Sequence, residues 1–256
     1  MSWGGFFKVD LRDHLAQITY ARPPINMLSF QALGYLEEIL TMLSEREELS
    51  VVVLTGGIPG YFAAHADTAD VMRMENGEPP AGDPDAWDRV NALLTDMPQL
   101  TVAAVNGQAW GGGCETALAC NLILLSEAGH LRLLEVSKGV LPGAGGTQRL
   151  PRRVGVPRAL QMILTTRILR GQEALDWGLA DALLPEEGVR EAVYDWLAPI
   201  LAQPVHAVRA AKEAIVRGSR LPLEDGLALE KASFRQLVSS EATKALGEKT
   251  VETLEP

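Results

Sequence analysis

Two uninterrupted apolar runs, each ending in glycine, constrain the fold of this 256-residue chain more than any other feature. The first is residues 50–55 (SVVVLT) before Gly56 and Gly57, and the second is residues 101–105 (TVAAV) before Asn106 and Gly107. A strand without polar alternation is buried on both faces, as the strands of parallel sheets are. Because such strands alternate with helical patterns along the chain, the sequence predicts an α/β fold with a largely parallel sheet covered by helices.

The remaining segments extend this pattern toward both ends of the chain. Residues 6–21 predict two short strands around a charged turn, Ser29 begins a helix that runs to about Glu48, and residues 121–126 predict another strand. Helical spacing dominates the last third. It covers residues 157–166, 172–178, 187–202, 205–217 and 222–246, with one strand at residues 181–184. We therefore expect a core of residues 1–190 and a helical region of residues 191–256.

The balance of charges limits the partners that the chain can bind. With 23 basic and 33 acidic side chains, the formal net charge is −10. Nucleic acids and anionic membranes are bound through clustered Lys and Arg, so neither is expected as a main partner. The longest uncharged segment, residues 97–114, contains a proline and four glycines and does not predict a membrane span.

Cysteine usage and the first residues of the chain favour the cytoplasm. Cys114 and Cys120 are too few for a disulfide framework and lie in an apolar stretch, where they are typical of small core residues. The N-terminal residues lack the basic start and the apolar run of a signal peptide. The four histidines show no metal-binding spacing, so we expect no metal site.

Two glycine-rich turns are candidates for phosphate loops, but neither fits such a motif. Residues 111–115 (GGGCE) and 143–147 (GAGGT) lack the Lys-Ser/Thr pair of a P-loop. Gln148 also stands where a dinucleotide fingerprint needs its third glycine. Both turns are therefore expected to serve another purpose.

A turn that precedes a helix can present free backbone N–H groups at the positive end of the helix dipole. Gly112 begins one predicted helix, and Ala66 lies just before another at residues 68–74. Two such N–H groups directed at one developing negative oxygen form an oxyanion hole. Each turn alone is more typical of packing than of function, and Asp67 alone is typical of an N-cap.

Glu115 and Glu135 are the candidate acid–base residues. Taken separately, a Glu in the first turn of a helix is typical of dipole capping, and a Glu at a strand end is typical of a solvated side chain. Both residues, however, lie beside glycine-rich turns, twenty residues apart, and flank a single predicted strand. This shared context favours two carboxylates that act together in general acid–base chemistry.

Three motifs resemble the crotonase (enoyl-CoA hydratase/isomerase) superfamily in order and spacing. They are residues 62–67 (FAAHAD), residues 103–107 with 111–115 (AAVNG, GGGCE), and residues 135–136 with 139–151 (EV, GVLPGAGGTQRLP). The resemblance implies a crotonase-like spiral of ββα units, with a C-terminal helical region that joins subunits into a homotrimer or a dimer of trimers. It also implies an acyl-CoA thioester whose oxygen accepts hydrogen bonds from the N–H groups of Ala66 and Gly112. No separate cofactor is implied, because coenzyme A is part of the substrate.

The two glutamates favour one activity within this superfamily. Hydratases carry glutamates at the positions of Glu115 and Glu135, whereas the isomerase branch typically keeps only the second. The resemblance therefore implies reversible syn addition of water to a trans-2-enoyl-CoA, which gives a 3-hydroxyacyl-CoA. Two alternatives stay open: isomerisation or another reaction through an enolate, and a non-catalytic subunit that binds acyl-CoA.

Further residues are candidates for contacts with the substrate. They lie around the two turns and in residues 69–97, where apolar residues at helical spacing are also typical of a core. The candidates are Ala64, Asp67, Met72, Trp87, Trp110 and Gly111, with Val71, Met74 and Val90 as neighbours. Arg22 and Lys249 are candidates for the CoA phosphates, because Ala69 stands where many relatives have a lysine. His65 replaces the family's usual glycine, and it either narrows the site, adds a polar group or faces away.

Overall fold

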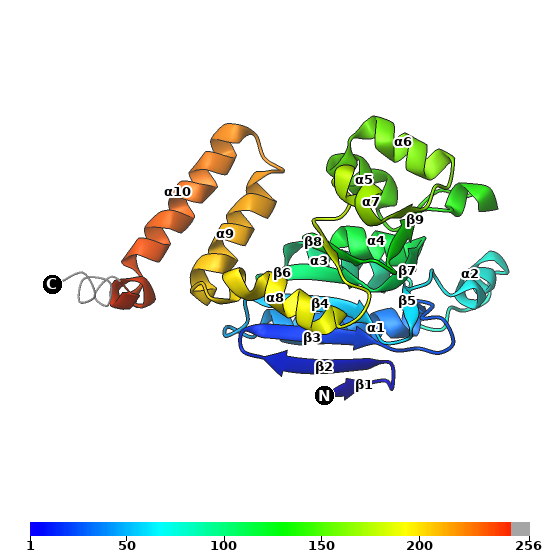
Figure 1. Ribbon diagram of the computed structural model, residues 1–256, viewed down its shortest axis with the longest axis horizontal. Coiled ribbons are helices and arrows are strands. Elements are labelled where there is room, and N and C mark those ends of the chain that lie inside the picture. Colours follow the sequence, from blue (N-terminus) through cyan, green and yellow to red (C-terminus); the bar gives the residue numbers. More distant parts are fainter. Residues whose placement is uncertain (247–256) are drawn as a thin grey trace.

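Two β-sheets form the framework of the computed structural model, which describes residues 1–246 (Figure 1). The larger sheet has seven strands in the order β1-β2-β3-β4-β6-β8-β11. They are β1 (Ser2–Trp3), β2 (Phe7–Arg12), β3 (Leu15–Tyr20), β4 (Val51–Gly56), β6 (Leu100–Val105), β8 (Leu122–Ser126) and β11 (Ala182–Leu184). The first three are antiparallel, and every pair from β3 to β11 is parallel.

The centre of this sheet confirms the prediction from the two apolar runs. β4 lies between β3 and β6, with Val51 opposite Leu15 on one side and Leu100 on the other. The side chains of residues 51–54 are all buried. Helices cover both faces of the sheet here, so apolar residues are favoured at every position rather than at alternate ones.

The smaller sheet was not expected from the sequence. Its order is β10-β9-β7-β5, formed by β10 (Leu169–Arg170), β9 (His130–Arg132), β7 (Gly107–Trp110) and β5 (Gly60–Ala63). These strands have two to four residues, too few for a periodic pattern, and β5 and β7 both begin with glycine. Glu115 and Glu135 therefore flank two strands, β8 and β9, and the prediction of a single strand between them was wrong.

The pairs β4 and β5, β6 and β7, and β8 and β9 each give one strand to each sheet before the chain turns into a helix, as in the expected ββα spiral. The helices are α1 (Phe30–Ser44), α2 (Thr68–Glu75), α3 (Ala86–Asp96), α4 (Gly112–Ala119), the 3-10 helix η1 (Glu135–Lys138), α5 (Gly146–Val154), α6 (Val156–Leu164), α7 (Gly171–Asp176), α8 (Val189–Leu201), α9 (Val205–Gly218) and α10 (Leu223–Ser239). The predicted fold class is confirmed.

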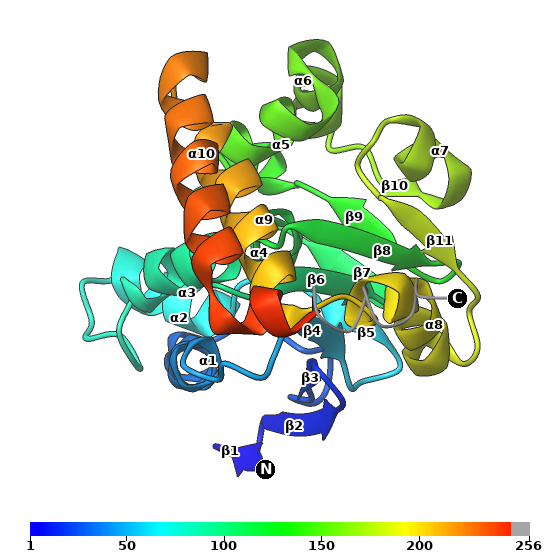
Figure 2. The same ribbon diagram turned by 90° about the vertical axis from the view of Figure 1, so that its left-hand side faces the viewer.

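The first helix of the predicted C-terminal region packs on the larger sheet, whereas the next two lie beside each other. α8 lies against the larger sheet, where Val193, Leu197 and Leu201 pack with Val51 and Val102. The predicted helical region of residues 191–256 therefore includes most of a helix that covers this sheet. Figures 1 and 2 show α9 and α10 side by side, and of this pair α9 makes the closer contacts with the core, through α3 and β6.

Membrane-spanning helices are absent from the part of the chain that the structure describes. None of the helices within residues 1–246 is both long and apolar enough to cross a bilayer.

Candidate active site

The candidate site lies at the carboxyl ends of three neighbouring strands of the smaller sheet. β5, β7 and β9 are parallel and adjacent, so the turns that follow them converge at one edge. The turn after β5 contains Ala66, α4 after β7 begins with Gly112, and η1 after β9 begins with Glu135. The short strands that the sequence pattern missed are therefore what brings the predicted residues together.

Ala66 presents a free N–H group because of its pairing with the segment before α1. Leu28 and Ala66 form a parallel β-bridge, in which Leu28 N–H donates to His65 O (2.8 Å) and Leu28 O accepts from Asp67 N–H (2.8 Å). This pairing uses the residues on either side of Ala66 and turns the polar groups of Ala66 itself away from Leu28. Its carbonyl accepts a hydrogen bond from His65 Nδ1 (2.7 Å), whereas its N–H has no partner among the described residues.

The Gly111–Gly113 turn places a second free N–H group beside the first. Gly111 has a φ of +50° and donates its N–H to Arg132 O (2.8 Å), which sets the direction in which α4 begins. A Cβ on Gly113 would lie 1.9 Å from Ala63 O, so only glycine allows α4 to approach β5 this closely. A Cβ on Gly112 would lie 3.5 Å from Ala66 N. The N–H groups of Ala66 and Gly112 are thus neighbours, and the second also lacks a partner among the described residues.

Glu115 is a buried carboxyl group held by a turn from elsewhere in the chain. It lies in the first turn of α4 with 3% of its surface exposed. Its Oε1 accepts hydrogen bonds from Ala144 N–H and Gly146 N–H, both at 2.8 Å, and Oε2 has no partner among the described residues. Burial, together with a smaller effect of the neighbouring Glu135, raises the pKa of Glu115 to about 7, although the two N–H bonds and the charge of Arg149 oppose this rise.

Glu135 provides the second carboxyl group at the first position of η1. The sequence placed it at a strand end, but β9 stops at Arg132 and the chain turns into a 3-10 helix. Its Oε2 is buried and makes no hydrogen bond, and burial raises the pKa of this carboxyl group. A carboxyl group in these surroundings is more easily protonated than an exposed one.

Both carboxyl groups line one cavity of about 380 Å³, together with the two free N–H groups. Its apolar wall comes from α1, α2 and α3 and from the segments that precede α1 and α3. The lining residues are Leu28, Phe30, Ala66, Asp67, Asp70, Val71, Met74, Pro84, Trp87, Asp88, Gly112, Glu115, Glu135, Gly143 and Ala144. An apolar cavity with a few convergent polar groups is the usual form of a small-molecule site.

The predicted substrate-contact residues are divided between this cavity and its surroundings. Trp87 and Asp67 line it, whereas Ala64, Met72, Trp110 and Gly111 are not among the lining residues. Met72 has 60% of its surface exposed, because it lies on the side of α2 that faces solvent. Val71 and Met74 of the same helix line the cavity in its place.

Trp110, Ala64 and Val90 do not line the cavity and instead make contacts within the fold. The indole Nε1–H of Trp110 donates to His130 Nδ1 (2.8 Å), and the Arg132 guanidinium lies over its ring. Ala64 is fully buried, and it donates its N–H to Asn26 O (3.1 Å). Val90 is also fully buried and belongs to the main core.

Of the two candidates for contacts with the CoA phosphates, Arg22 lies within the described residues and Lys249 does not. Arg22 forms an ion pair with Asp67 (Nη2–Oδ2, 2.7 Å), and Asp67 also caps α2 through a hydrogen bond from Ala69 N–H (3.0 Å). The positive charge of Arg22 is thus directed at the turn that carries Ala66. Lys249 lies outside the described residues.

The support of Glu115 by the turn of residues 143–146 does not follow from the sequence pattern. The motif GAGG at this position only indicated free N–H groups before a helix, which are general anion-binding features. The carboxylate that they hold comes from a residue about thirty positions earlier, and pattern analysis does not reveal this pairing. The same holds for Leu28, Phe30 and Pro84, which reach the cavity from loops and helix ends.

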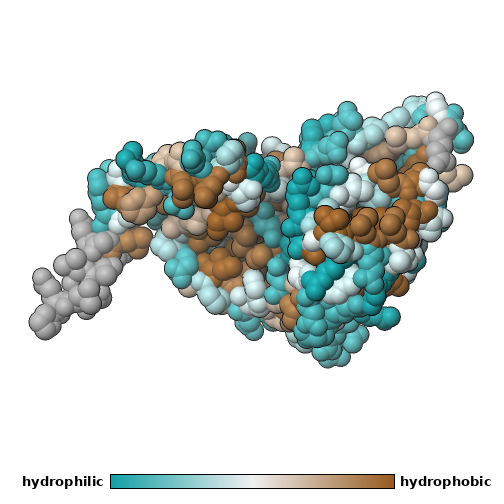
Figure 3. All heavy atoms as spheres, turned by 90° about the horizontal axis from the view of Figure 1, so that it is seen from above, coloured by the Kyte–Doolittle hydropathy of each residue, from teal (hydrophilic) through white to brown (hydrophobic). Residues whose placement is uncertain are grey.

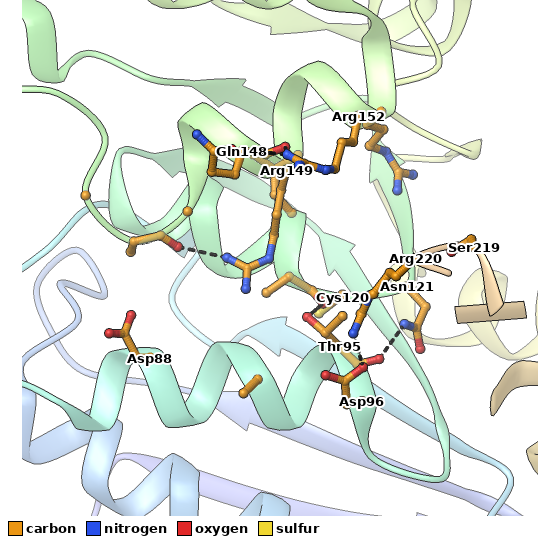
Figure 4. A pocket seen from close by; sticks show the side chains of 17 residues that line it. Asp88, Thr95, Asp96, Cys120, Asn121, Gln148, Arg149, Arg152, Ser219 and Arg220 are labelled. Carbon is orange, nitrogen blue, oxygen red and sulfur yellow. Dashed lines mark hydrogen bonds and ion pairs between the residues drawn. The ribbon is translucent and has the colours of Figure 1, made fainter. Parts of the chain in front are cut away.

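A larger cavity of about 790 Å³ adjoins the first one, and Asp88, Gly143 and Ala144 line both. Its wall includes four arginines, of which Arg153 pairs with Asp181 and Arg220 pairs with Asp96. Figure 4 shows the side chain of Arg149 extending from α5 into this cavity. Its Nη1 donates to Ala144 O at 3.0 Å.

Comparisons of the chain with a family model, with related sequences and with solved structures agree on one family. The family model described as enoyl-CoA hydratase/isomerase matches residues 10–256. Mitochondrial methylglutaconyl-CoA hydratase of Rattus norvegicus is 34% identical over 84% of this chain and 69% of its own. The crystal structure of enoyl-CoA hydratase from Bacillus anthracis superposes with a TM-score of 0.85 at 33% identity, covering 95% of this chain and 96% of that one. A Thermobifida fusca YX structure in complex with CoA gives a TM-score of 0.80 at 27% identity, covering 91% and 93%.

Proposed function

The chain belongs to the enoyl-CoA hydratase/isomerase family, and we propose that it catalyses the reversible addition of water to a trans-2-enoyl-CoA, which gives a 3-hydroxyacyl-CoA. One observation carries this proposal: Glu115, Glu135 and the free N–H groups of Ala66 and Gly112 share a single cavity. A reaction through an enolate alone needs only one carboxylate. The presence of two supports the addition of water, because one can activate the water while the other supplies a proton.

In the proposed mechanism, the thioester oxygen accepts hydrogen bonds from Ala66 N–H and Gly112 N–H. Negative charge develops on this oxygen as the hydroxide of water bonds to C3, and the two N–H groups stabilise it. Loss of one such donor in other enzymes costs on the order of 3 kcal/mol of barrier. Because these donors belong to the main chain, their direction depends on the turns after β5 and β7 rather than on a side-chain rotamer.

The geometry supports a different role for each carboxyl group. Two N–H donors hold Oε1 of Glu115 and favour its charged form, so its Oε2 is suited to take a proton from the attacking water. Oε2 of Glu135 is buried without a hydrogen-bond donor that would favour its charged form, so this group is suited to deliver a proton to C2. Water thus contributes its hydroxide to C3 and, through the two carboxyl groups, a proton to C2.

The test is the loss of enoyl-thioester absorbance when enzyme is added to a short trans-2-enoyl-CoA. We expect Glu115→Gln and Glu135→Gln each to lower kcat by about 100-fold to 10,000-fold, the range of general acid–base catalysis. Glu127→Gln is the control, because Glu127 is exposed and does not line the cavity. If the two active-site variants hydrate as fast as the parent, the two-carboxylate mechanism is excluded.

The pH dependence of the same assay gives a second check. Since Glu115 must be ionised to accept the proton and burial raises its pKa to about 7, kcat/KM should fall as the pH drops below about 7. This acidic limb should be absent in Glu115→Gln. Conversion of a 3-enoyl-CoA without detectable water addition would instead identify an isomerase.

A further inference from the structure

A buried asparagine, Asn91, contacts one of the two residues whose N–H groups donate to Glu115. Ala144 donates its N–H to Glu115 Oε1 (2.8 Å), and its own carbonyl accepts two hydrogen bonds. One comes from Asn91 Nδ2 at 2.9 Å and the other from Arg149 Nη1 at 3.0 Å. Ala144, which orients the carboxylate, is therefore held by α3 on one side and by α5 on the other.

Asn91 is unusual in its surroundings. It has 1% of its surface exposed, and its Oδ1 is buried without a hydrogen-bond partner. A buried amide that leaves its oxygen unpaired costs free energy, whereas an apolar side chain of the same size would not. The hydrogen bond to Ala144 O is the interaction that the side chain of Asn91 makes in the described part of the chain.

Asn91 also lies on the face of α3 that contacts the catalytic elements. Trp87, Asn91 and Thr95 follow one another at intervals of four residues, so they share one face of the helix. The Trp87 ring lies against Gly112, and Thr95 Oγ1 donates to Ala119 O (3.0 Å) at the end of α4. α3 therefore contacts both ends of the helix that carries Glu115, and Asn91 between them contacts the turn that holds its carboxylate.

We propose that Asn91 is a positioning residue for Glu115: it fixes the Ala144 peptide so that the N–H of Ala144 stays directed at Oε1 and Oε2 stays directed at the reacting water. This inference rests on the proposed function, which it extends by one residue. Asn91 does not line the cavity, so it acts through Ala144 rather than on the substrate.

The charged groups and hydrogen bonds around Glu115 determine its pKa. A less rigid turn at residues 143–146 would therefore change that pKa. Glu135 from η1 and Asp88 from α3 line the same cavity, and Arg149 from α5 approaches from the other side of Ala144. The N–H bonds from Gly146 and Ala144 lower the pKa of Glu115 against the effect of burial. If removal of the Asn91 amide weakens the bond from Ala144, this pKa rises.

The test compares Asn91→Leu with Gln99→Leu. Leucine has the same number of side-chain heavy atoms and the same branching as asparagine and adds no charge, and Arg149 still satisfies the Ala144 carbonyl. Gln99 is a matched control: it is fully buried, donates its Nε2 to Leu43 O and Arg46 O (both 3.0 Å), and also leaves its oxygen unpaired. Its contacts are at the end of α1, away from Glu115.

The primary readout is the pKa of Glu115, measured by carbon-13 NMR titration of the glutamate carboxyl groups and assigned with Glu115→Gln. We expect Asn91→Leu to raise it by about one pH unit and Gln99→Leu to leave it unchanged. In the hydratase assay, Asn91→Leu should lower kcat about tenfold to a hundredfold with little change in KM. Asn91→Ser, whose side chain is too short to reach Ala144 O, should behave in the same way and provides a second variant if the leucine protein does not fold.

The outcomes separate this proposal from the proposed function. An unchanged Glu115 pKa in Asn91→Leu and Asn91→Ser overturns the positioning role, as does an equal shift in Gln99→Leu. If the parent hydrates no enoyl-CoA, the proposed function fails, but the NMR titration still decides whether Asn91 orients Glu115.

Discussion

The burial of Glu115, the proposed proton acceptor, has a cost in stability that depends on pH. The carboxyl group is buried in α4, and burial raises its pKa from 4.5 to about 7. The folded protein therefore binds a proton at this position more tightly than the unfolded chain does. The contribution of this group to stability is fully present below pH 4.5 and is lost as the pH rises through about 7.

We predict that Glu115→Gln is more stable relative to the parent at pH 8 than at pH 4.5. The difference should reach about 3 kcal/mol, because one pH unit of pKa shift corresponds to about 1.4 kcal/mol. Urea unfolding at the two pH values measures it. The exposed Glu127→Gln should show no such difference, and an equal effect of Glu115→Gln at both pH values would contradict the prediction.

At the scale of single residues, the sequence identified the polar groups of the site better than its apolar wall. The four residues with the clearest local pattern, Ala66, Gly112, Glu115 and Glu135, all line one cavity. Met72 and Trp110 do not, since helical spacing and strand alternation do not tell which of two faces turns toward a site. Asn91 has no pattern of its own, because its partner is a carbonyl group from a distant turn.

At the scale of secondary structure, the contact between α3 and the beginning of α4 determines how Gly112 is placed. A Cβ on Gly112 would lie 2.3 Å from Cζ2 and 2.5 Å from Cη2 of Trp87. Atoms do not approach this closely, so a side chain here must displace either the indole ring or the turn. The glycine therefore allows the free N–H of Gly112 and the ring of Trp87 to occupy the same corner of the cavity.

We predict that Gly112→Ala lowers the hydration rate by about 100-fold, the effect of displacing one oxyanion donor. Because phenylalanine is smaller than tryptophan, Gly112→Ala combined with Trp87→Phe should recover part of this loss relative to Gly112→Ala alone. Steady-state kinetics of both proteins provide the test. Gly34→Ala is the control, since a Cβ at Gly34 meets no atom within 4 Å. No recovery in the double variant would show that the clash with Trp87 is not the cause.

The length of a helix or strand decides whether the sequence pattern predicts it. The strands of the larger sheet with five or six residues and most helices were predicted to within a few residues, because each contains a full hydrophobic repeat. β5, β7 and β9 are shorter than such a repeat. Their pairing depends on the larger sheet having already brought the ββα units together, which is a tertiary effect.

At the scale of the whole molecule, apolar side chains remain exposed on α9 and α10. Leu223, Leu227, Phe234 and Val238 of α10 and Ile215 of α9 each have between 50% and 77% of their surface exposed. Figure 3 shows apolar residues on the surface over this end of the molecule. A single chain gains nothing from such a surface, and contiguous apolar patches are typical of protein interfaces.

We predict that the protein self-associates through this surface, as expected for a homotrimer or a dimer of trimers. Leu227→Asp combined with Phe234→Asp should yield smaller species, because burying the new charges in an interface is costly. Light scattering after size-exclusion chromatography measures the mass of the parent and the variant. Gln236→Asp, on the same helix, is the matched control. A parent protein that is monomeric at micromolar concentration would contradict the prediction.

The division of the site between main chain and side chains has a consequence for how this protein can evolve. In the proposed mechanism, the groups that stabilise the thioester oxygen are amides, which no single codon change removes unless it introduces proline. The groups that would move protons in this mechanism are two side chains on separate elements, α4 and η1. A point mutation can therefore replace either proton carrier while the turns that bind the thioester stay in place. In such a gene, a new reaction on the same class of substrate lies one substitution away, whereas a new class of substrate requires rebuilding the turns.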